Sequence, residues 1–446
     1  RTDMKTREQQ SVRPLARRAD GGPASTLKYR FNWNSPLIAS PHDQKVIYLG
    51  GNVVFKSSDF GTTWETISPD LTTNDPEKQK TAGGPGWTEN TTAEFHCTII
   101  SLAESPLSKG LLWAGTDDGN LQVSQDGGAT WQNVVKNIPG VPAFSPVSHI
   151  EPSRLEAGTA YCSFDRHMFD DFRPYVFRTK DYGKTWLNIC GNLPSKAYIW
   201  VIRQDPKNSN LIYAGTELGL FASYTGGKEW IKLHLKNLPT VAVHDILVHP
   251  RENDLVLGTH GRSIWIFDDA TSIQQISEAV LEQPAFLFDI RPALRFAMKP
   301  TRYGIGDKLY LGPNPAYGAL ITYYLKEKPK KETEVKLEIM DGSGKLIRKL
   351  TKIPVEEGLN RIAWDLRYEG PRQRREREEE ESFFFRGPRG PQALPGSYTV
   401  RLSLGEKTFE KPVEVKLDPT ISVSREDLAL EQEYSLKLCE MQSFSN

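Results

Sequence analysis

The stretch SSDFGTTW, from Ser57 to Trp64, decides the fold because near copies of it recur along the chain. SQDGGATW begins at Ser124, TKDYGKTW at Thr179 and a weaker copy, SYTGGKEW, at Ser223. The shared pattern is Ser/Thr-x-Asp-x-Gly-x-Thr-Trp, which we name the Trp corner. Asp caps its own turn by accepting backbone N–H bonds, Gly allows a positive φ, and Trp buries a large apolar ring. Each copy is therefore predicted to be a strand–turn–strand corner.

The Trp corners are spaced like the blades of a β-propeller. Successive aspartates are 67 residues (59 to 126) and 55 residues (126 to 181) apart, and the aligned Thr225 follows 44 residues later. One blade takes about 40–45 residues, and the excess falls in Pro/Gly/Asn-rich stretches that are typical of loops. Alternating apolar residues around each corner favour short β-strands. The corner residues predicted to be structural are Asp59, Gly61, Trp64, Asp126, Gly128, Trp131, Asp181, Gly183, Trp186 and Trp230.

The repeat stops after about residue 285, where a different all-β pattern begins. Runs at 319–327, 333–350, 358–367 and 396–418 favour strands of an Ig-like β-sandwich, with hairpin turns at Asp341-Gly342 and Gly405-Glu406. RQRREREEEE (372–381) is predicted to be a solvated loop. Ser424 and Asp427 resemble a capping box. The predicted domains are propeller blades over 1–284, a sandwich over 285–420 and the start of a helical tail over 421–446.

The first blade is predicted to be incomplete, because residues 1–14 resemble only its outer two strands. The propeller is therefore expected to be partial, or part of a larger propeller. We expect a missing N-terminal part of the same protein, or a partner chain, to complete the ring.

Composition argues against several functions. The 56 basic and 56 acidic residues balance, so no global field attracts nucleic acid, and no apolar run has the length of a membrane span. Cys97, Cys162, Cys190 and Cys439 lack metal-binding spacing and suit a protein without disulfides, although one Cys162–Cys190 bridge stays open as an alternative. We predict no metal and no cofactor, with calcium in the acidic loop FDRHMFDD (164–171) as a weaker alternative.

Together with the segments AGTDDGN, YAGTELGLF and GTHGRSIWIFDD, the corners resemble those of the BNR/Asp-box repeat proteins. That family includes sialidases, xyloglucan-hydrolysing two-propeller enzymes and the luminal domain of sortilin. The chain is most similar to large bacterial sortilin-like repeat proteins, often labelled glycosyl hydrolases by repeat content. The resemblance implies a propeller followed by an Ig-like domain and a helical tail, in a protein that is secreted, periplasmic or at the cell surface. It also implies that the Asp box is structural and lies away from any active site.

If each corner joins the third strand of a blade to the fourth, the loops after the second strands lie on the opposite face. Polar side chains of both signs gather in these loops, with Tyr198, Trp200 and Trp87 as platforms for a sugar or a peptide and Glu94 as a further polar residue. The acidic residues alternatively only satisfy turn amides, and His244 is more typical of a packed strand residue. The predicted ligand-binding residues are Asp117, Asp118, Glu217, His260, Arg262, Asp165, Arg166, His167 and His96.

We interpret the chain as a non-catalytic binding or scaffold protein whose propeller face holds a peptide, a protein or a glycan. The alternative is a glycoside hydrolase acting on a polysaccharide. It would need two carboxyls about 5–5.5 or 6.5–9.5 Å apart, supplied by Asp117 or Asp118 with Glu217. A sialidase is disfavoured because no Arg-Ile-Pro segment precedes the first corner and arginines on this face are few. Motifs of metalloproteases, serine hydrolases and phosphate-binding loops are absent from the sequence.

Overall fold

A computed structural model describes residues 1–14, 23–80, 95–297, 312–372 and 389–445. Trp87, Glu94 and residues 373–381 of the predicted charged loop lie outside these ranges. The chain forms two compact units, Arg1–Phe267 and Asp268–Asn446. This division precedes the boundary expected at residue 284, because Arg361 of the second unit binds the carbonyl groups of Asp268 and Asp269.

The first unit consists of five antiparallel sheets that follow one another along the chain. We number them as blades 1 to 5. Blade 1 contains β1 (Leu37–Ala39), β2 (Ile47–Gly50), β3 (Val54–Ser57) and β4 (Glu65–Thr66); blade 2 contains β5 (Ile99–Glu104), β6 (Leu112–Thr116), β7 (Leu121–Ser124) and β8 (Gln132–Asn133); blade 3 contains β9 (Val147–Pro152), β10 (Ala160–Phe164), β11 (Tyr175–Thr179) and β12 (Leu187–Asn188); blade 4 contains β13 (Ile199–Gln204), β14 (Ile212–Thr216), β15 (Gly219–Ser223) and β16 (Ile231–Lys232); blade 5 contains β17 (Val243–Val248), β18 (Leu255–Thr259) and β19 (Ile264–Phe267). Short 3₁₀ helices interrupt the loops at η1 (Ala24–Thr26), η2 (Pro76–Gln79), η3 (Val135–Asn137) and η4 (His167–Phe169).

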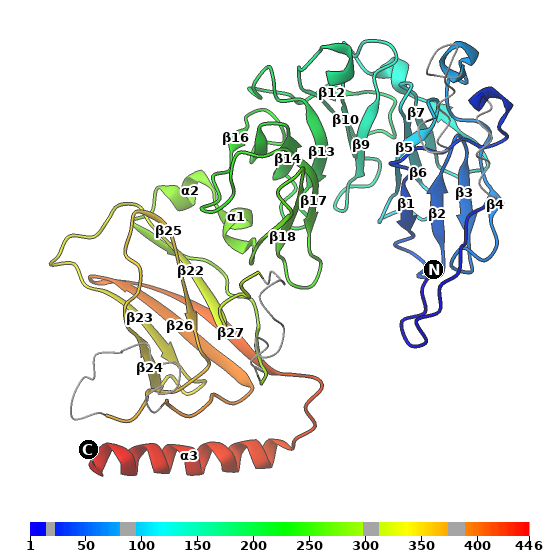
Figure 1. Cartoon of the computed structure of the whole chain (residues 1–446). Helices are drawn as coiled ribbons and strands as arrows, with labels where there is room; N and C mark the ends of the chain where they lie inside the picture. The colour runs from blue at the N-terminus through cyan, green and yellow to red at the C-terminus, as the bar shows by residue number, and fades with distance from the viewer. Residues whose placement is uncertain (15–22, 81–94, 298–311, 373–388, 446) are drawn as a thin grey trace. The chain divides into compact units, whose positions relative to one another are not determined.

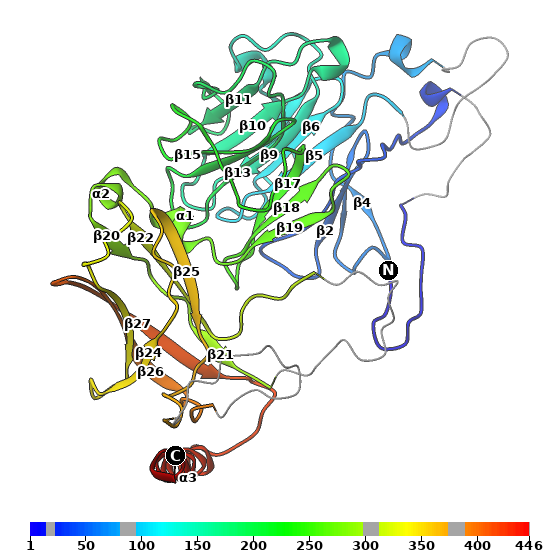
Figure 2. The ribbon, with the colours of Figure 1, turned by 60° about the vertical axis from the view of Figure 1, so that its left-hand side comes forward.

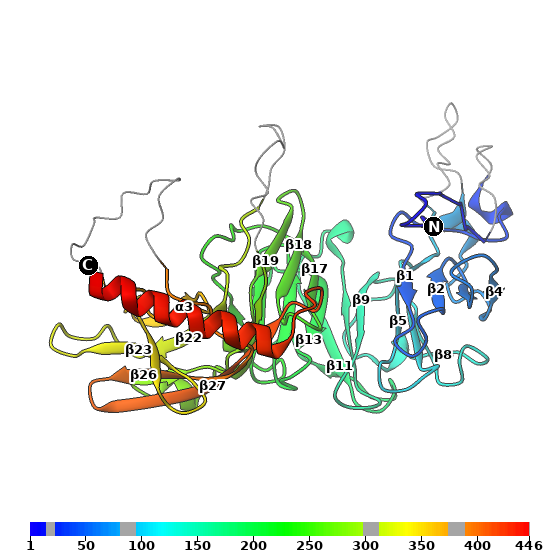
Figure 3. The same cartoon turned by 90° about the horizontal axis from the view of Figure 1, so that it is seen from below.

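The blades lie side by side in chain order, as Figures 1 and 3 show. The first strand of each blade contacts the first strand of the next, from β1 through β5, β9 and β13 to β17. First strands that adjoin one another on the inside, with the later strands further out, are the radial arrangement of a β-propeller. The predicted fold class, all-β with propeller blades, is therefore confirmed.

The Trp corner has the geometry that its sequence predicts. Asp59 accepts hydrogen bonds from the backbone N–H (2.9 Å) and the hydroxyl (2.7 Å) of Thr63, and Phe60 and Gly61 have φ of 58° and 85°. The corners at Asp126 and Asp181 repeat these bonds. In the weaker fourth copy, the hydroxyl of Thr225 replaces the carboxylate and accepts one N–H bond, from Glu229.

Each corner also contacts the blade before it. The indole N–H of Trp230 donates to the carbonyl oxygen of Ile189, and that of Trp131 donates to Ile67. The same bond joins Trp64 to Val12. Val12 therefore has the position relative to blade 1 that Ile67 has relative to blade 2. The segment 1–14 lies where the outer strand of another blade would lie.

The second unit is a β-sandwich followed by a helix (Figure 2). Its elements are α1 (Thr271–Gln275), α2 (Glu278–Leu281), β20 (Ala285–Leu287), β21 (Ala293–Arg295), β22 (Ala319–Leu325), β23 (Val335–Met340), β24 (Leu346–Leu350), β25 (Gly358–Trp364), β26 (Gly396–Leu404), β27 (Lys407–Leu417) and α3 (Arg425–Ser445). The sheets have the orders β20-β22-β25 and β21-β27-β26-β23-β24, and β21 pairs in parallel with β27. One apolar core joins them and includes Tyr323 and Trp364 from the first sheet and Val400 from the second.

The structure also tests two local predictions for the second unit and one for the first. The hairpin turns lie at Asp341 and at Gly405, as expected. Ser424 caps α3 by accepting the N–H of Asp427, whose carboxylate accepts the Ser424 hydroxyl. The alternative Cys162–Cys190 bridge is not formed, because all four cysteines are free thiols. Within the described residues, no helix combines the length and the apolar character that a membrane span requires.

Candidate functional site

The two ends of each blade carry different loops. At one end, the Trp corner lies beside the turn between the first two strands of its own blade. Gly127 donates to the carbonyl of Gly110 in blade 2, and Tyr182 donates to Gly158 in blade 3. The loop after the second strand begins at the opposite end of the blade. We name that end the loop face.

On the loop face, two aspartates, a glutamate and a histidine occupy one equivalent position in their blades. Each is the first residue after the second strand of its blade, and its N–H donates to a backbone carbonyl next to the start of the innermost strand of the same blade. The four bonds join Asp117 to Thr98 (3.0 Å), Asp165 to Pro146 (3.0 Å), Glu217 to Tyr198 (3.3 Å) and His260 to Ala242 (3.0 Å). The backbone is thus the same in blades 2 to 5, and the chemistry of the face depends on which side chain stands there.

Asp118, predicted to bind a ligand, is buried and engaged in hydrogen bonds within the protein. It is 1% exposed, and its Oδ2 accepts the N–H (2.7 Å) and the hydroxyl (2.6 Å) of Thr73, a residue on the loop that leaves blade 1. Its Oδ1 accepts the hydroxyl of Thr116. Asp118 therefore holds the loop that contains Thr73 against blade 2, and these bonds occupy both of its carboxylate oxygens.

Asp117 is occupied in a similar way. Its two oxygens accept the N–H and the hydroxyl of Thr98, both at 2.8 Å. His96 Nδ1 lies 3.5 Å from Asp117 Oδ2, and this contact raises the pKa of His96. The group formed by His96, Asp117 and Asp118 belongs to blade 2. Within the described residues, neither aspartate contacts Glu217, so the predicted carboxylate pair is not supported.

Blades 3 to 5 instead build a continuous stack of rings on the loop face. Ring centroids are 4.9 Å apart for His167 and Tyr198, 5.5 Å for Tyr198 and Trp200, 4.0 Å for Trp200 and His244, and 4.8 Å for His244 and His260. The His167–Tyr198 and Trp200–His244 pairs are parallel-stacked, at 17° and 29°. We name these five residues the ring stack. His244 belongs to it, although the sequence favoured a packed strand residue.

A β-bulge places two members of the ring stack. The pairing register shifts between Ile199 and Val201 in β13, and between Val243 and Asp245 in β17. The extra residue is Trp200 in blade 4 and His244 in blade 5. A bulge leaves one residue unpaired and redirects its side chain. Sequence alignment of the inner strands could have found this pair, because Trp200 and His244 hold the same place in their blades.

Two carboxylates border the ring stack. Glu217 is exposed, and its Oε2 accepts the indole N–H of Trp200 at 3.2 Å. Asp165 accepts the backbone N–H of His167 at 3.0 Å and lies 2.6 Å from its Nδ1, which fixes the orientation of the ring. Burial, then a hydrogen bond with Glu217, and then the charges of Glu217 and Asp165 raise the pKa of Tyr198. Burial and neighbouring His260 lower the pKa of His244, which favours a neutral ring.

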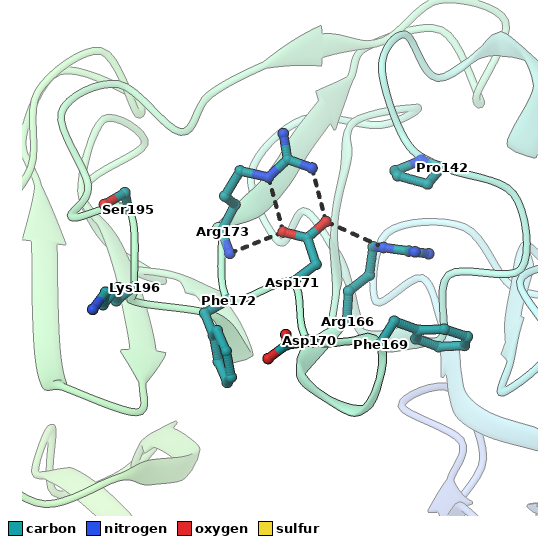
Figure 4. A pocket seen from close by; sticks show the side chains of 9 residues that line it. All are labelled: Pro142, Arg166, Phe169, Asp170, Asp171, Phe172, Arg173, Ser195 and Lys196. Carbon is teal, nitrogen blue, oxygen red and sulfur yellow. Dashed lines mark hydrogen bonds and ion pairs between the residues drawn. The ribbon is translucent and has the colours of Figure 1, made fainter.

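A pocket of about 590 Å³ lies beside the ring stack, between the 165–173 loop and residues 195–196 (Figure 4). Asp171 stands between Arg166 (3.3 Å) and Arg173 (2.8 Å), as the dashed lines show. Hydrogen bonds from Arg173 lower the pKa of Asp171. Arg166 is therefore engaged in positioning its own loop. Phe172 connects the pocket to the ring stack, with its ring centroid 6.0 Å from that of Tyr198.

The remaining predictions for this face concern Arg262 and metal ions. Arg262 is exposed in the β18–β19 loop, two residues after His260. In the part of the chain that the structure describes, no group of three or more His, Cys, Asp or Glu residues is placed to hold a metal ion. The loop considered for calcium has Asp165 bound to His167 and Asp171 bound to two arginines.

Comparisons with known proteins give distant similarities. No family model matches the chain. A xyloglucanase from Paenibacillus sp. is 25% identical over 251 residues, which are 48% of this chain and 23% of that enzyme, so the chain spans less than a quarter of its relative's length.

Similar solved structures include an ancestral GH74 enzyme, with 14% identity over 77% of this chain and 40% of that chain and a TM-score of 0.41. The GH74 enzyme of Niastella koreensis is 13% identical over 84% of this chain and 56% of that chain, with a TM-score of 0.37. A third is the extracellular domain of a putative hybrid two-component system from B. thetaiotaomicron. It is 13% identical over 87% of this chain and 44% of that chain, with a TM-score of 0.34.

Proposed function

We propose that the loop face of blades 3 to 5 binds a glycan without hydrolysing it. The ring stack carries this proposal. Trp200 is partly exposed and His260 is exposed, whereas Tyr198 is buried, and aromatic rings that reach the surface offer flat platforms for the faces of sugar rings. The exposed Glu217 carboxylate beside Trp200 supplies acceptors for sugar hydroxyls. A concave site with aromatic walls and a few placed polar groups is the general form of a binding site.

The binding proposal leaves out hydrolysis because most carboxylates near the ring stack are already bonded within the protein. A glycosidase needs one carboxyl as acid and a second as base or nucleophile. Asp118 and Asp117 accept hydrogen bonds from Thr73 and Thr98, and Asp165 is hydrogen-bonded to the ring of His167. Glu217 is therefore the carboxylate that both is exposed and contacts a member of the ring stack among the described residues. We further propose that the protein acts outside the cytoplasm, where polysaccharides are met.

Binding should be measured first with xyloglucan oligosaccharides, chosen because of the xyloglucanase similarity, and then with a glycan array. Trp200→Ala and Glu217→Gln should each raise the dissociation constant by about tenfold or more, a loss of about 1.4 kcal/mol of binding free energy. Asp118→Asn is the matched acidic control: it should lower stability and leave affinity unchanged. Binding of peptides but of no glycan would contradict the glycan proposal.

The second candidate function is a glycoside hydrolase, which the 25% identity with a xyloglucanase favours. In that case Glu217 is the residue to test, with Asp165 as its partner, since both charges act on Tyr198. Reducing ends released from xyloglucan by the wild type, and lost in Glu217→Gln with unchanged folding, would replace the binding proposal by this one.

A further inference from the structure

Blade 5 exposes an apolar face that its sister blades bury. Leu121 in blade 2, Val176 in blade 3 and Leu220 in blade 4 hold one equivalent position on the third strand, and they are 0%, 0% and 1% exposed. The equivalent residue in blade 5 is Ile264, which pairs with Gly258 and is 68% exposed. Ile264 is thus exposed to solvent at a position where three other blades have a buried aliphatic residue.

The exposure extends over the same face of the blade. Ile266 is 60% exposed, whereas its equivalents Val123 in blade 2 and Ala222 in blade 4 are 2% and 0% exposed; blade 3 has Arg178 at this position. Leu247 on the innermost strand is also exposed. We name Leu247, Ile264 and Ile266 the blade 5 face. Contiguous exposed apolar groups of this kind mark an interaction surface.

The sister blades show what covers this position. Leu121 and Val123 of blade 2 belong to one buried cluster with Ile150, Cys162 and Phe177 of blade 3. Blade 3 packs against blade 4 in the same way, since Tyr161 and Val176 share a cluster with residues of β13, β14 and β15. In both cases the residues that cover this position belong to the next blade in the series.

The edge of blade 5 is open as well. In blades 1 to 4 a short fourth strand pairs with the third; for example, Val123 pairs with Gln132 and Ala222 with Ile231. Among the described residues, β19 pairs with β18 alone, and blade 5 has three strands. The backbone at Trp265 and Ile266 is therefore available to an additional antiparallel strand.

We propose that the blade 5 face and the edge of β19 at Trp265 and Ile266 bind a further propeller blade, carried by polypeptide other than residues 1–446. The interface between blades 2 and 3 indicates what the further blade should contain. Its innermost strand should carry an aliphatic residue where blade 3 has Ile150, and its third strand an aromatic residue where blade 3 has Phe177. Blade 1 gives independent support. Val12 accepts the indole N–H of Trp64, as Ile67 at the outer strand of blade 1 accepts that of Trp131. The two ends of the blade series are thus both interfaces for further blades.

The test is the chemical accessibility of the blade 5 face. Ile264→Cys is introduced into the protein in the cells that produce it and into the purified 446-residue chain, and labelling by N-ethylmaleimide is followed at that peptide by mass spectrometry. Lys207→Cys, at an exposed turn of blade 4, is the matched control. We expect Cys at 264 to react in the purified chain and about tenfold or more slowly in the protein isolated from cells. The control should react equally in both.

Equal labelling at position 264 in both preparations would overturn the proposal. So would concentration-dependent self-association of the purified chain that Ile264→Asp abolishes, because the occupant would then be a second copy. Since Ile264 is already exposed, these substitutions should leave the unfolding transition unchanged, and this is checked by circular dichroism. Failure of the glycan-binding proposal would leave these results unaffected, because the blade 5 face includes no residue of the ring stack.

Discussion

The indole nitrogen of Trp131 in blade 2 lies 3.2 Å from the carbonyl oxygen of Ile67, which follows the last strand of blade 1. Trp230 and Ile189 are related in the same way at 2.9 Å, and Trp64 and Val12 at 2.7 Å. The Trp corner therefore has two roles. Its aspartate closes the turn of one blade, and Trp64, Trp131 and Trp230 each bond to the segment that precedes their blade. The indole of Trp186 donates instead to Gly183 of its own corner.

Loss of a corner tryptophan should weaken the contact between blades. Trp230 is 3% exposed, so we expect Trp230→Ala to lower the free energy of unfolding by about 3–5 kcal/mol. Trp230→Phe keeps most of the apolar ring and should lose about 1 kcal/mol with the hydrogen bond to Ile189. Hydrogen exchange of the backbone amides in blades 3 and 4 measures both. Equal losses for the two variants would show that the hydrogen bond dominates.

The second glycine of the corner should tolerate no side chain. A Cβ at Gly128 would lie 2.7 Å from the carbonyl oxygen of Ile67, whereas a Cβ at Gly127 would meet nothing within 4 Å. Both residues have positive φ, 100° and 76°. Gly127→Ala should therefore cost only the backbone strain, about 1–2 kcal/mol, and Gly128→Ala distinctly more. Urea denaturation of the two variants makes the comparison, and similar midpoints would refute the close contact between blades.

The corner aspartates should make the propeller sensitive to acid. Hydrogen bonds from Thr63 lower the pKa of Asp59 from 3.8 to about 2, and those from Thr130 do the same for Asp126. A lowered pKa in the folded state contributes stability above pH 3.8, and this contribution is lost as the pH falls towards 2. The double variant Asp59→Asn/Asp126→Asn should flatten the decline in melting temperature over this window. Asp170→Asn, at an exposed loop position, is the control that should leave the decline intact.

The contact between His96 and Asp117 should be visible in the titration of the imidazole. Hydrogen bonding to Asp117 raises the pKa of His96 above 6.5. Asp117→Asn removes the charge and should return the pKa towards 6.5, as followed by the NMR shifts of the ring. The wild-type contact stabilises the fold at low pH and is lost as the pH rises through the raised pKa. An unchanged pKa in Asp117→Asn would mean that another group sets the protonation of His96.

Much of the fold follows from local sequence. Asp, Gly and Trp at fixed spacing define a turn that the aspartate closes by hydrogen bonds to a threonine four residues later, as Asp126 does with Thr130. Alternating apolar residues define the strands around it. The same holds for the hairpin at Gly405 and for the cap of α3 at Ser424. The candidate site was less predictable. Asp118 was expected to face a ligand, but its acceptor bonds come from Thr73, a partner 45 residues away in the sequence.

The sequence by itself therefore determined that the chain repeats a four-stranded unit with a capped corner, because those interactions are short-range. Only the tertiary structure decided which polar groups of the loop face are used internally and which border the ring stack. It also decided that blade 5 leaves Ile264 uncovered. The physical reason is that burial and hydrogen-bond satisfaction depend on what lies opposite a side chain, and in this protein the opposite group belongs to another blade.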